Sequence, residues 1–178
     1  MAWETTSTRT AYENRWIRVR EDQVVRPDGT DGVYGVVELR QPAVFVVALT
    51  DDDEVVLVTV DRHTTGLSVE VPAGGTDGED PLLAAQRELL EETGYTAADW
   101  THVGSMQALN GVCEAPEHVF VARGLTSSAA TGHHEEGISE VRAVPFPEVL
   151  AMVANGTITD GETVAALMYA ALHLGRVR

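Results

Sequence analysis

The sequence has few of the features that several classes of protein require. Its single cysteine, Cys113, excludes an internal disulfide framework and is typical of a protein in a reducing compartment. No apolar run approaches the ~20 residues that cross a bilayer. The first residues lack the apolar stretch of a signal peptide. We therefore expect a soluble cytoplasmic protein.

Basic residues are also scarce. Twelve Lys and Arg stand against 28 Asp and Glu, which gives a formal net charge of −16 at pH 7. A protein that binds a phosphate backbone needs clustered basic side chains. Nucleic acid is therefore excluded as a partner, and an anionic membrane surface is excluded for the same reason.

Apolar residues are plentiful enough for a sizeable core, since 44% of the 178 residues are hydrophobic. Residues 1–13 are polar and are expected to be loose. Alternating or continuous apolar runs after them predict eight strands and, with capping signals, three helices, which together favour an α+β fold with a mostly antiparallel or mixed sheet. The strands are expected at 16–25, 32–39, 43–50, 54–60, 67–73, 102–109, 117–123 and 138–145, and the helices at 81–93, 146–156 and 160–175.

The helix at 81–93 has clear limits. Asp80 suits the N-cap, Pro81 the first helical position, and Gly94 the C-terminal cap. The helical period predicts two separate arcs of side chains. The arc expected to face the sheet holds Leu82, Leu83, Ala85, Leu89, Leu90 and Thr93, and the opposite arc holds Glu88, Glu91 and Glu92.

The three clustered glutamates have two interpretations. One is an ordinary solvated acidic face. The other is a cation site, because like charges at this spacing repel by roughly 0.2–0.5 kcal/mol per pair. Glu91 and Glu92 also lie near the C-terminus of the helix, which is the unfavourable end of the helix dipole for negative charge. A divalent cation would reverse both penalties. The preceding glycines, Gly74, Gly75 and Gly78, would let the backbone approach a metal or a phosphate, and Arg87 would orient a neighbouring carboxylate.

The segment from Arg87 to Tyr95, RELLEETGY, resembles the core of the Nudix box. Seven residues separate Glu79 from Arg87, as in the family pattern, whereas four residues rather than five separate Gly74 from Glu79. The segments YENRWIRVREDQV, VPAGG, FVARGL and GTITDGETVAAL resemble the ADP-ribose pyrophosphatase branch of that family.

The resemblance implies a Nudix-type α/β/α sandwich with a mixed sheet, preceded by an N-terminal β-hairpin. Residues 1–41 would form the hairpin region and a dimer contact, and residues 42–178 the Nudix hydrolase domain, within one structural unit. The implied activity is metal-dependent hydrolysis of the diphosphate linkage of a nucleoside diphosphate sugar. ADP-ribose is favoured, with AMP and ribose 5-phosphate as products, and Mg²⁺ or Mn²⁺ as cofactor.

The resemblance also assigns the metal ligands. Glu88 and Glu92 come first, followed by Glu91 and the backbone carbonyl of Ala73, and Glu79 assists directly or through another ligand. With Arg87, the three helical glutamates form the expected catalytic group.

The resemblance also implies a general base on the loop HHEEG, at Glu135 or Glu136. Glu114 and Glu117 on another loop are rivals for this role. For substrate binding, Arg62 either pairs with a phosphate or is an ordinary surface arginine. Glu70 either meets a sugar or base or faces solvent. Gly74 and Gly75 complete the expected substrate-binding set.

Three alternatives remain open at the level of function. ADP-ribose hydrolases often carry a proline about fifteen residues after the box, where this sequence has Leu109 and Asn110, so another nucleoside diphosphate derivative is one alternative. A non-catalytic Nudix module that senses a nucleotide is the second. A plain acidic interaction domain is the third.

Overall fold

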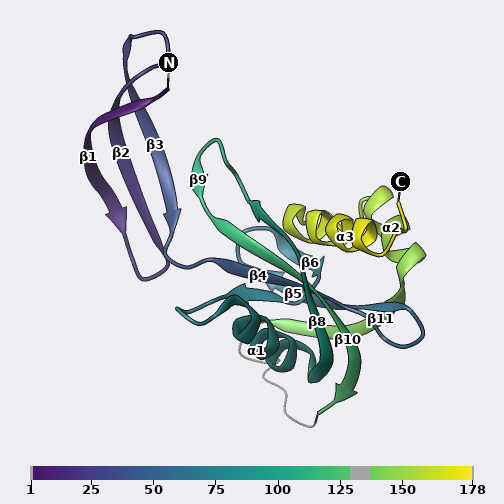
Figure 1. Cartoon of the computed structure of the whole chain (residues 1–178). Helices are drawn as coiled ribbons and strands as arrows, with labels where there is room; N and C mark the ends of the chain where they lie inside the picture. Colours follow the sequence, from purple (N-terminus) through teal and green to yellow (C-terminus); the bar gives the residue numbers. More distant parts are fainter. Residues whose placement is uncertain (1, 129–136, 178) are drawn as a thin grey trace. The chain divides into compact units, whose positions relative to one another are not determined.

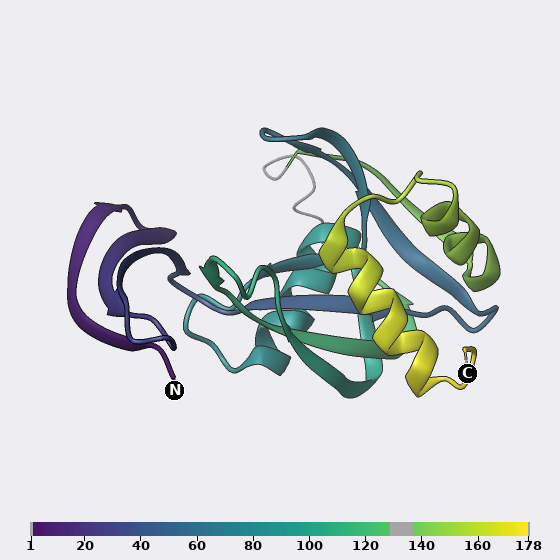
Figure 2. The same ribbon diagram turned by 90° about the horizontal axis from the view of Figure 1, so that it is seen from above.

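The computed structural model describes residues 2–128 and 137–177. The chain divides into two compact units, one formed by Met1–Pro42 with Gln107–Pro116 and the other by Ala43–Met106 with Glu117–Arg178 (Figures 1 and 2). Three helices and a set of mixed sheets confirm the predicted α+β class. Among the described residues, no helix has both the length and the apolar character needed to cross a membrane.

The first unit is a four-stranded sheet in the order β1-β2-β3-β9. Its strands are β1 (Glu4–Glu13), β2 (Ile17–Val25), β3 (Asp31–Leu39) and β9 (Cys113–Glu114). The antiparallel β2–β3 ladder, closed at Asp28 and Gly29, confirms the predicted hairpin. The expectation that residues 1–13 are loose is wrong. β1 pairs with β2 through its backbone while all ten of its residues stay exposed, so its side chains carry no hydrophobic alternation.

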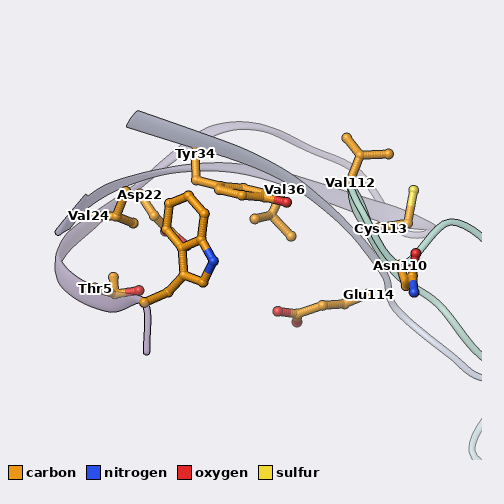
Figure 3. Close-up of a pocket in the computed structure, with 10 residues that line it drawn as sticks. Thr5, Asp22, Val24, Tyr34, Val36, Asn110, Val112, Cys113 and Glu114 are labelled. Carbon is orange, nitrogen blue, oxygen red and sulfur yellow. The ribbon is translucent and has the colours of Figure 1, made fainter. Parts of the chain in front are cut away.

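A cavity of about 350 Å³ lies within this first unit (Figure 3). The indole of Trp3 meets the ring of Tyr34 edge-on, with the centroids 5.3 Å apart. The Tyr34 hydroxyl donates to the carbonyl of Gly111, which ties β3 to the segment before β9. The aromatic pair and the buried carboxylate of Asp22 therefore share one small cavity.

The second unit contains two sheets, in the orders β7-β4-β10-β8 and β11-β5-β6. β10 runs parallel to β4, whereas the pairs β4–β7, β5–β6 and β5–β11 are antiparallel, so the unit is mixed. The strand predicted at 102–109 begins earlier, directly after the first helix. The bounds are β4 Ala43–Ala48, β5 Glu54–Arg62, β6 Gly66–Glu70, β7 Ala73–Gly75, β8 Tyr95–Gln107, β10 Pro116–Ser127 and β11 Ile138–Pro145.

Helices cover both faces of these sheets. α1 (Pro81–Thr93) lies on one face, and α2 (Phe146–Ala154) and α3 (Gly161–His173) lie on the other (Figure 1). β4 is buried on both faces, as its continuous apolar run predicts. Val44 and Val46 pack with α1, and Phe45 and Val47 pack with α2 and α3. The arrangement confirms the predicted α/β/α sandwich.

The face that α1 buries differs from the prediction. Leu83 is 57% exposed, whereas Ala85, Glu88 and Glu92 are buried. Glu88 and Glu92 follow Ala85 by three and seven residues, which places all three on one side of a helix. The two glutamates therefore belong to the side that meets the sheet and not to an opposite arc.

Candidate active site

The helix α1 is fixed at both ends by the caps that the sequence predicts. The Asp80 side chain accepts a hydrogen bond from the Leu82 N–H at 2.9 Å, and Pro81 occupies the first turn. Gly94 adopts φ 72° and its N–H bonds the carbonyl of Leu90. A residue with a Cβ rarely adopts this conformation. These caps fix where the glutamates of the helix project.

Arg87 joins the carboxylates to the loop before the helix. Its Nη1 donates to Glu88 Oε1 at 2.7 Å and to Glu91 Oε2 at 3.1 Å, and its Nε donates to Glu79 Oε2 at 3.0 Å. Its Nη2 donates to the carbonyl of Gly75 at 2.9 Å. Burial lowers the pKa of Arg87, but the bonds and charges of these glutamates outweigh it and raise the pKa above its ordinary value. The guanidinium therefore stays charged and orients the group.

Gly74 lets Glu88 lie directly on the strand β7. A Cβ built on Gly74 would overlap the carboxyl group of Glu88, whereas a Cβ on Gly75 would make only an ordinary contact with Asp77 at 3.8 Å. The two neighbouring glycines therefore have different roles. Gly74 is required for the position of Glu88, and Gly75 supplies the carbonyl that Arg87 holds.

Glu92 is attached to the same strand. Its Oε2 accepts a hydrogen bond from the backbone N–H of Ala73 at 2.9 Å. Glu88 and Glu92 are only 4% and 5% exposed. The side chains of Glu79 and Glu91 are 43% and 45% exposed. The cluster thus combines two buried carboxylates at the sheet with two that reach toward solvent.

The donor chemistry of this cluster fits a hard divalent cation. Carboxylate oxygens and backbone carbonyls are the ligands that Mg²⁺ takes, together with water and phosphate oxygens. Within the described parts of the chain, no three acidic, histidine or cysteine side chains are already arranged around one ion position. Arg87 contacts Glu79, Glu88 and Glu91, so a cation would share these carboxylates with the guanidinium.

Arg62 and Glu70 form a two-point ion pair near this cluster. Arg62 Nε lies 3.1 Å from Glu70 Oε1, and Nη2 lies 2.5 Å from Oε2. Glu70 is 6% exposed, so the alternative in which it faces solvent is wrong. The bond to Glu70 raises the pKa of Arg62, and the charges of Glu92 and Asp160 add to this. Arg62 is thus part of the same charged region and not an isolated surface arginine.

Glu117 lies at the start of β10 and is 5% exposed. Its Oε2 is buried without a hydrogen-bond partner among the described residues. Burial, together with the charges of Glu162 and Asp160 at the start of α3, raises the pKa of Glu117 to about 7. Sequence reasoning named Glu117 only as a rival base and missed the neighbourhood of Asp160 and Glu162, which are more than 40 residues away in the chain.

The other candidates for the base belong to the first unit or lie outside the described residues. Glu114 belongs to the first unit, where Arg20 donates to both of its oxygens at 3.1 and 2.6 Å. These bonds lower the pKa of Glu114, which makes it a weak base. Glu135 and Glu136 lie outside the described residues, so their assignment stays a prediction.

Comparison with known proteins agrees with this geometry. Residues 39–167 match the NUDIX domain, and residues 3–37 match the nucleoside diphosphate sugar hydrolase N-terminal domain. The chain is 33% identical over 170 residues to an ADP-ribose pyrophosphatase of Mycobacterium tuberculosis, which covers 93% of this chain and 82% of the relative. It is 32% identical over 170 residues to a methanol dehydrogenase activator of Bacillus methanolicus, covering 93% and 91%.

A solved structure described as an ADP compounds hydrolase shares the fold. It aligns with a TM-score of 0.85 over 98% of this chain and 97% of that chain, at 22% sequence identity. The family match spans most of the chain and includes the capped helix with its four glutamate and arginine positions. The chain therefore belongs to the Nudix family and is a Nudix pyrophosphohydrolase.

Proposed function

We propose that the protein hydrolyses the diphosphate linkage of a nucleoside diphosphate sugar in a reaction that depends on Mg²⁺ or Mn²⁺. ADP-ribose is the first candidate substrate, and its products would be AMP and ribose 5-phosphate. The observation that carries this proposal is the pair of buried carboxylates, Glu88 and Glu92, held against β7 beside Arg87. The match of residues 3–37 to a nucleoside diphosphate sugar hydrolase domain supports the substrate class.

Glu88 and Glu92 would hold the cation, with Glu91, Glu79 and the Ala73 carbonyl completing the set. A bound divalent cation neutralises diphosphate charge and lowers the pKa of coordinated water. Two residues of the chain hold these carboxylates in position. Gly74 admits Glu88 to the strand, and Arg87 keeps the remaining carboxylates together. The backbone of Gly74 and Gly75 would line the phosphate side of the site.

Arg62 would contact a phosphate of the substrate. A guanidinium has five N–H donors, and Glu70 engages the donors on two nitrogens. The Arg62 side chain is 45% exposed, so its remaining donors can reach a ligand. Glu70 would then fix the direction of the arginine rather than bind the substrate alone.

A substrate panel tests the proposal. ADP-ribose and other nucleoside diphosphate sugars are incubated with Mg²⁺ or Mn²⁺, and a coupled phosphatase reports the released monophosphates. We expect turnover that requires the metal and is greatest with ADP-ribose. Binding without turnover across the panel would favour the nucleotide-sensing module instead. Neither binding nor turnover would favour the acidic interaction domain.

Hydrolysis of another nucleoside diphosphate derivative is the second candidate. Asn110, at a position where ADP-ribose hydrolases often have proline, favours it. The same panel decides between the two by the ratio of kcat/KM values. A larger value for a substrate other than ADP-ribose would replace the first candidate.

We also propose that the first unit forms a homodimer contact. All ten residues of β1 are exposed, and large apolar side chains of the unit, including Trp16 and Val33, are 60% and 58% exposed. Such surface is typical of a subunit interface. Light scattering after gel filtration should give twice the 19.1 kDa chain mass; a monomer would contradict the proposal. The cytoplasmic location stays a prediction.

A further inference from the structure

The segment Val71–Ala73 leads from β6 into the glycine loop, and hydrogen bonds from neighbouring elements hold it in place. The Pro72 carbonyl accepts a hydrogen bond from the Val46 N–H of β4 at 2.9 Å. The Ala73 N–H donates to Glu92 Oε2 of α1 at 2.9 Å. The segment therefore connects the inner strand β4 to a buried carboxylate of the candidate active site.

The direction of the Ala73 carbonyl follows from the strand pairing. β7 is the edge strand of its sheet and runs antiparallel to β4. In such a strand the N–H and the carbonyl of one residue point to the same side, and every second residue repeats the direction. The Ala73 N–H points to Glu92, and the Gly75 carbonyl points to Arg87. The Ala73 carbonyl therefore points away from β4, toward the side where α1 presents its carboxylates.

Thr163, in the first turn of α3, holds the other end of this segment. Its Oγ1 accepts a hydrogen bond from the Val71 N–H at 3.2 Å. Both residues are buried, with exposed fractions of 0% for Thr163 and 1% for Val71. They are 92 residues apart in the sequence. The bond thus ties α3 to the segment that α1 contacts, although the two helices cover opposite faces of the sheets (Figure 1).

The start of α3 gives the Thr163 hydroxyl a fixed position. Asp160 is the N-cap of the helix, and its Oδ2 accepts a hydrogen bond from the Thr163 N–H at 2.7 Å. One and two turns further along, Ala166 and Ala170 are fully buried and belong to the same core cluster as Val71. Cap and core together therefore hold the hydroxyl at a defined place relative to the sheet.

The connection from Val71 to Ala73 is short and stiff. Only Pro72 lies between them, and its ring fixes φ near −65°. One of the backbone dihedral angles that could absorb a displacement is therefore missing. The Pro72 carbonyl is also bonded to β4. A displacement of Val71 is thus passed on to the peptide group of Ala73, which is the group that Glu92 contacts.

We propose that Thr163 is a positioning residue of the cation site, an inference that rests on the proposed function. Its hydroxyl holds Val71 and thereby the Ala73 peptide. Ala73 in turn orients its own carbonyl and the carboxylate of Glu92, which are proposed ligands of one cation. Partners that orient metal ligands contribute about 10- to 100-fold to metal affinity. α3 therefore contributes to metal affinity without contacting the metal.

The test measures Mn²⁺ binding to the whole chain without substrate, from the decrease of the free-ion signal in electron paramagnetic resonance. T163V removes the hydroxyl at nearly constant volume and should weaken, by about 10- to 100-fold, the Mn²⁺ site that E92Q removes. T163S keeps the hydroxyl and should bind like wild type. T50V is the matched control, because Thr50 Oγ1 also accepts a backbone N–H, that of Glu54 at 3.1 Å, between β4 and β5. It should bind like wild type.

Turnover gives a second measurement that a loss of stability alone would not change in the same way. T163V should need more Mn²⁺ for half-maximal turnover, and saturating Mn²⁺ should restore most of kcat, because the carboxylates themselves are intact. Circular dichroism in metal-free buffer checks the fold. If T163V does not fold, T163A, which also lacks the hydroxyl, takes its place with the same expectations.

The outcomes separate this inference from the proposed function. If E92Q removes the Mn²⁺ site but T163V binds Mn²⁺ as tightly as wild type, Thr163 does not position the site, and the proposed function stands. Equal weakening in T163V and T50V, or in T163V and T163S, would make the bond a general structural contact and overturn the inference. If wild type has no Mn²⁺ site that E92Q removes, the proposed cation site and this inference both fail.

Discussion

The two units of the chain differ in how arginines balance their acidic side chains. In the first unit, Arg20 bonds both Asp22 and Glu114, and these bonds lower the pKa of each acid. In the second unit, the pKa of Glu117 and of Glu162 is raised, because burial and neighbouring carboxylates are not matched by arginines. The acids of the second unit thus carry negative charge that its arginines do not fully balance, even where Glu88 and Glu91 bond Arg87.

The arginines follow the same division. Arg18, Arg20 and Arg40 each pair with acids across the strands of the first unit. In the second unit a single arginine, Arg87, donates hydrogen bonds to Glu79, Glu88 and Glu91. The negative charge that remains is consistent with the proposed cation. The following predictions test this contrast, beginning with the largest effect.

E92Q should lower kcat/KM by at least about 100-fold, because one charged ligand for the cation is lost while metal ions contribute several kcal/mol to such reactions. The fold should persist, since removal of one charge reduces repulsion within the cluster. The matched control is E21Q in the first unit, where Glu21 pairs with the exposed Arg9. Equal activity of E92Q and E21Q would remove the functional distinction between the units.

G74A and G75A form a matched pair one residue apart. In G74A the new Cβ displaces the Glu88 carboxyl group, and a shift of about 1 Å in a catalytic group can cost up to about 100-fold in rate. We expect G74A to lose about 10-fold or more in kcat/KM and G75A to stay close to wild type. Steady-state kinetics at saturating Mg²⁺ measures both. Equal losses would show that Glu88 is not specifically held by Gly74.

The pH dependence of stability should have opposite signs in the two units. Glu117 has a raised pKa of about 7, against 4.5 for an ordinary glutamate. Its contribution to stability is therefore complete below pH 4.5 and is lost as the pH rises through 7. E117Q should thus be more stable than wild type at pH 8, by about 1–3 kcal/mol.

D22N is the counterpart of E117Q. The bond from Arg20 lowers the pKa of Asp22 in the folded protein. The contribution of Asp22 to stability is therefore present at a pH above its pKa in the unfolded chain, and it is lost as the pH falls through its pKa in the folded protein. D22N should therefore be less stable than wild type at pH 8. Urea unfolding at pH 5 and pH 8 measures both variants. If D22N and E117Q changed the unfolding free energy in the same direction at pH 8, the proposed difference between the two units would be wrong.

R9Q should have the smallest effect. Arg9 pairs with Glu21 at 3.0 Å, but its side chain is 65% exposed, and exposed ion pairs contribute at most about 1 kcal/mol. We expect a small loss in unfolding free energy that 1 M salt removes, with unchanged turnover. A large loss of unfolding free energy would mean that β1 depends on this ion pair, and that exposed ion pairs stabilise the first unit more than is usual for such pairs.

Much of the second unit follows from local sequence signals. Asp80, Pro81 and Gly94 predict the limits of α1 to the residue, and the apolar run at 43–50 predicts a strand buried on both faces. The prediction of strands and buried faces was weaker where apolar and polar side chains do not alternate. All ten residues of β1 are exposed, so no hydrophobic alternation marks the strand. Met168 in α3 is 47% exposed, because the small alanines at 166, 170 and 171 are the buried residues of that helix instead.

The sequence by itself determined the family, the capped helix and the order of its glutamates, because caps, helical period and motif spacing depend on residues a few positions apart. Only the tertiary structure decided which acids are buried and which charges meet. Gly75, Ala43 and Glu117 lie side by side on three neighbouring strands because of strand order and register. These join segments that no local pattern relates, and the burial they create sets the pKa of Glu117.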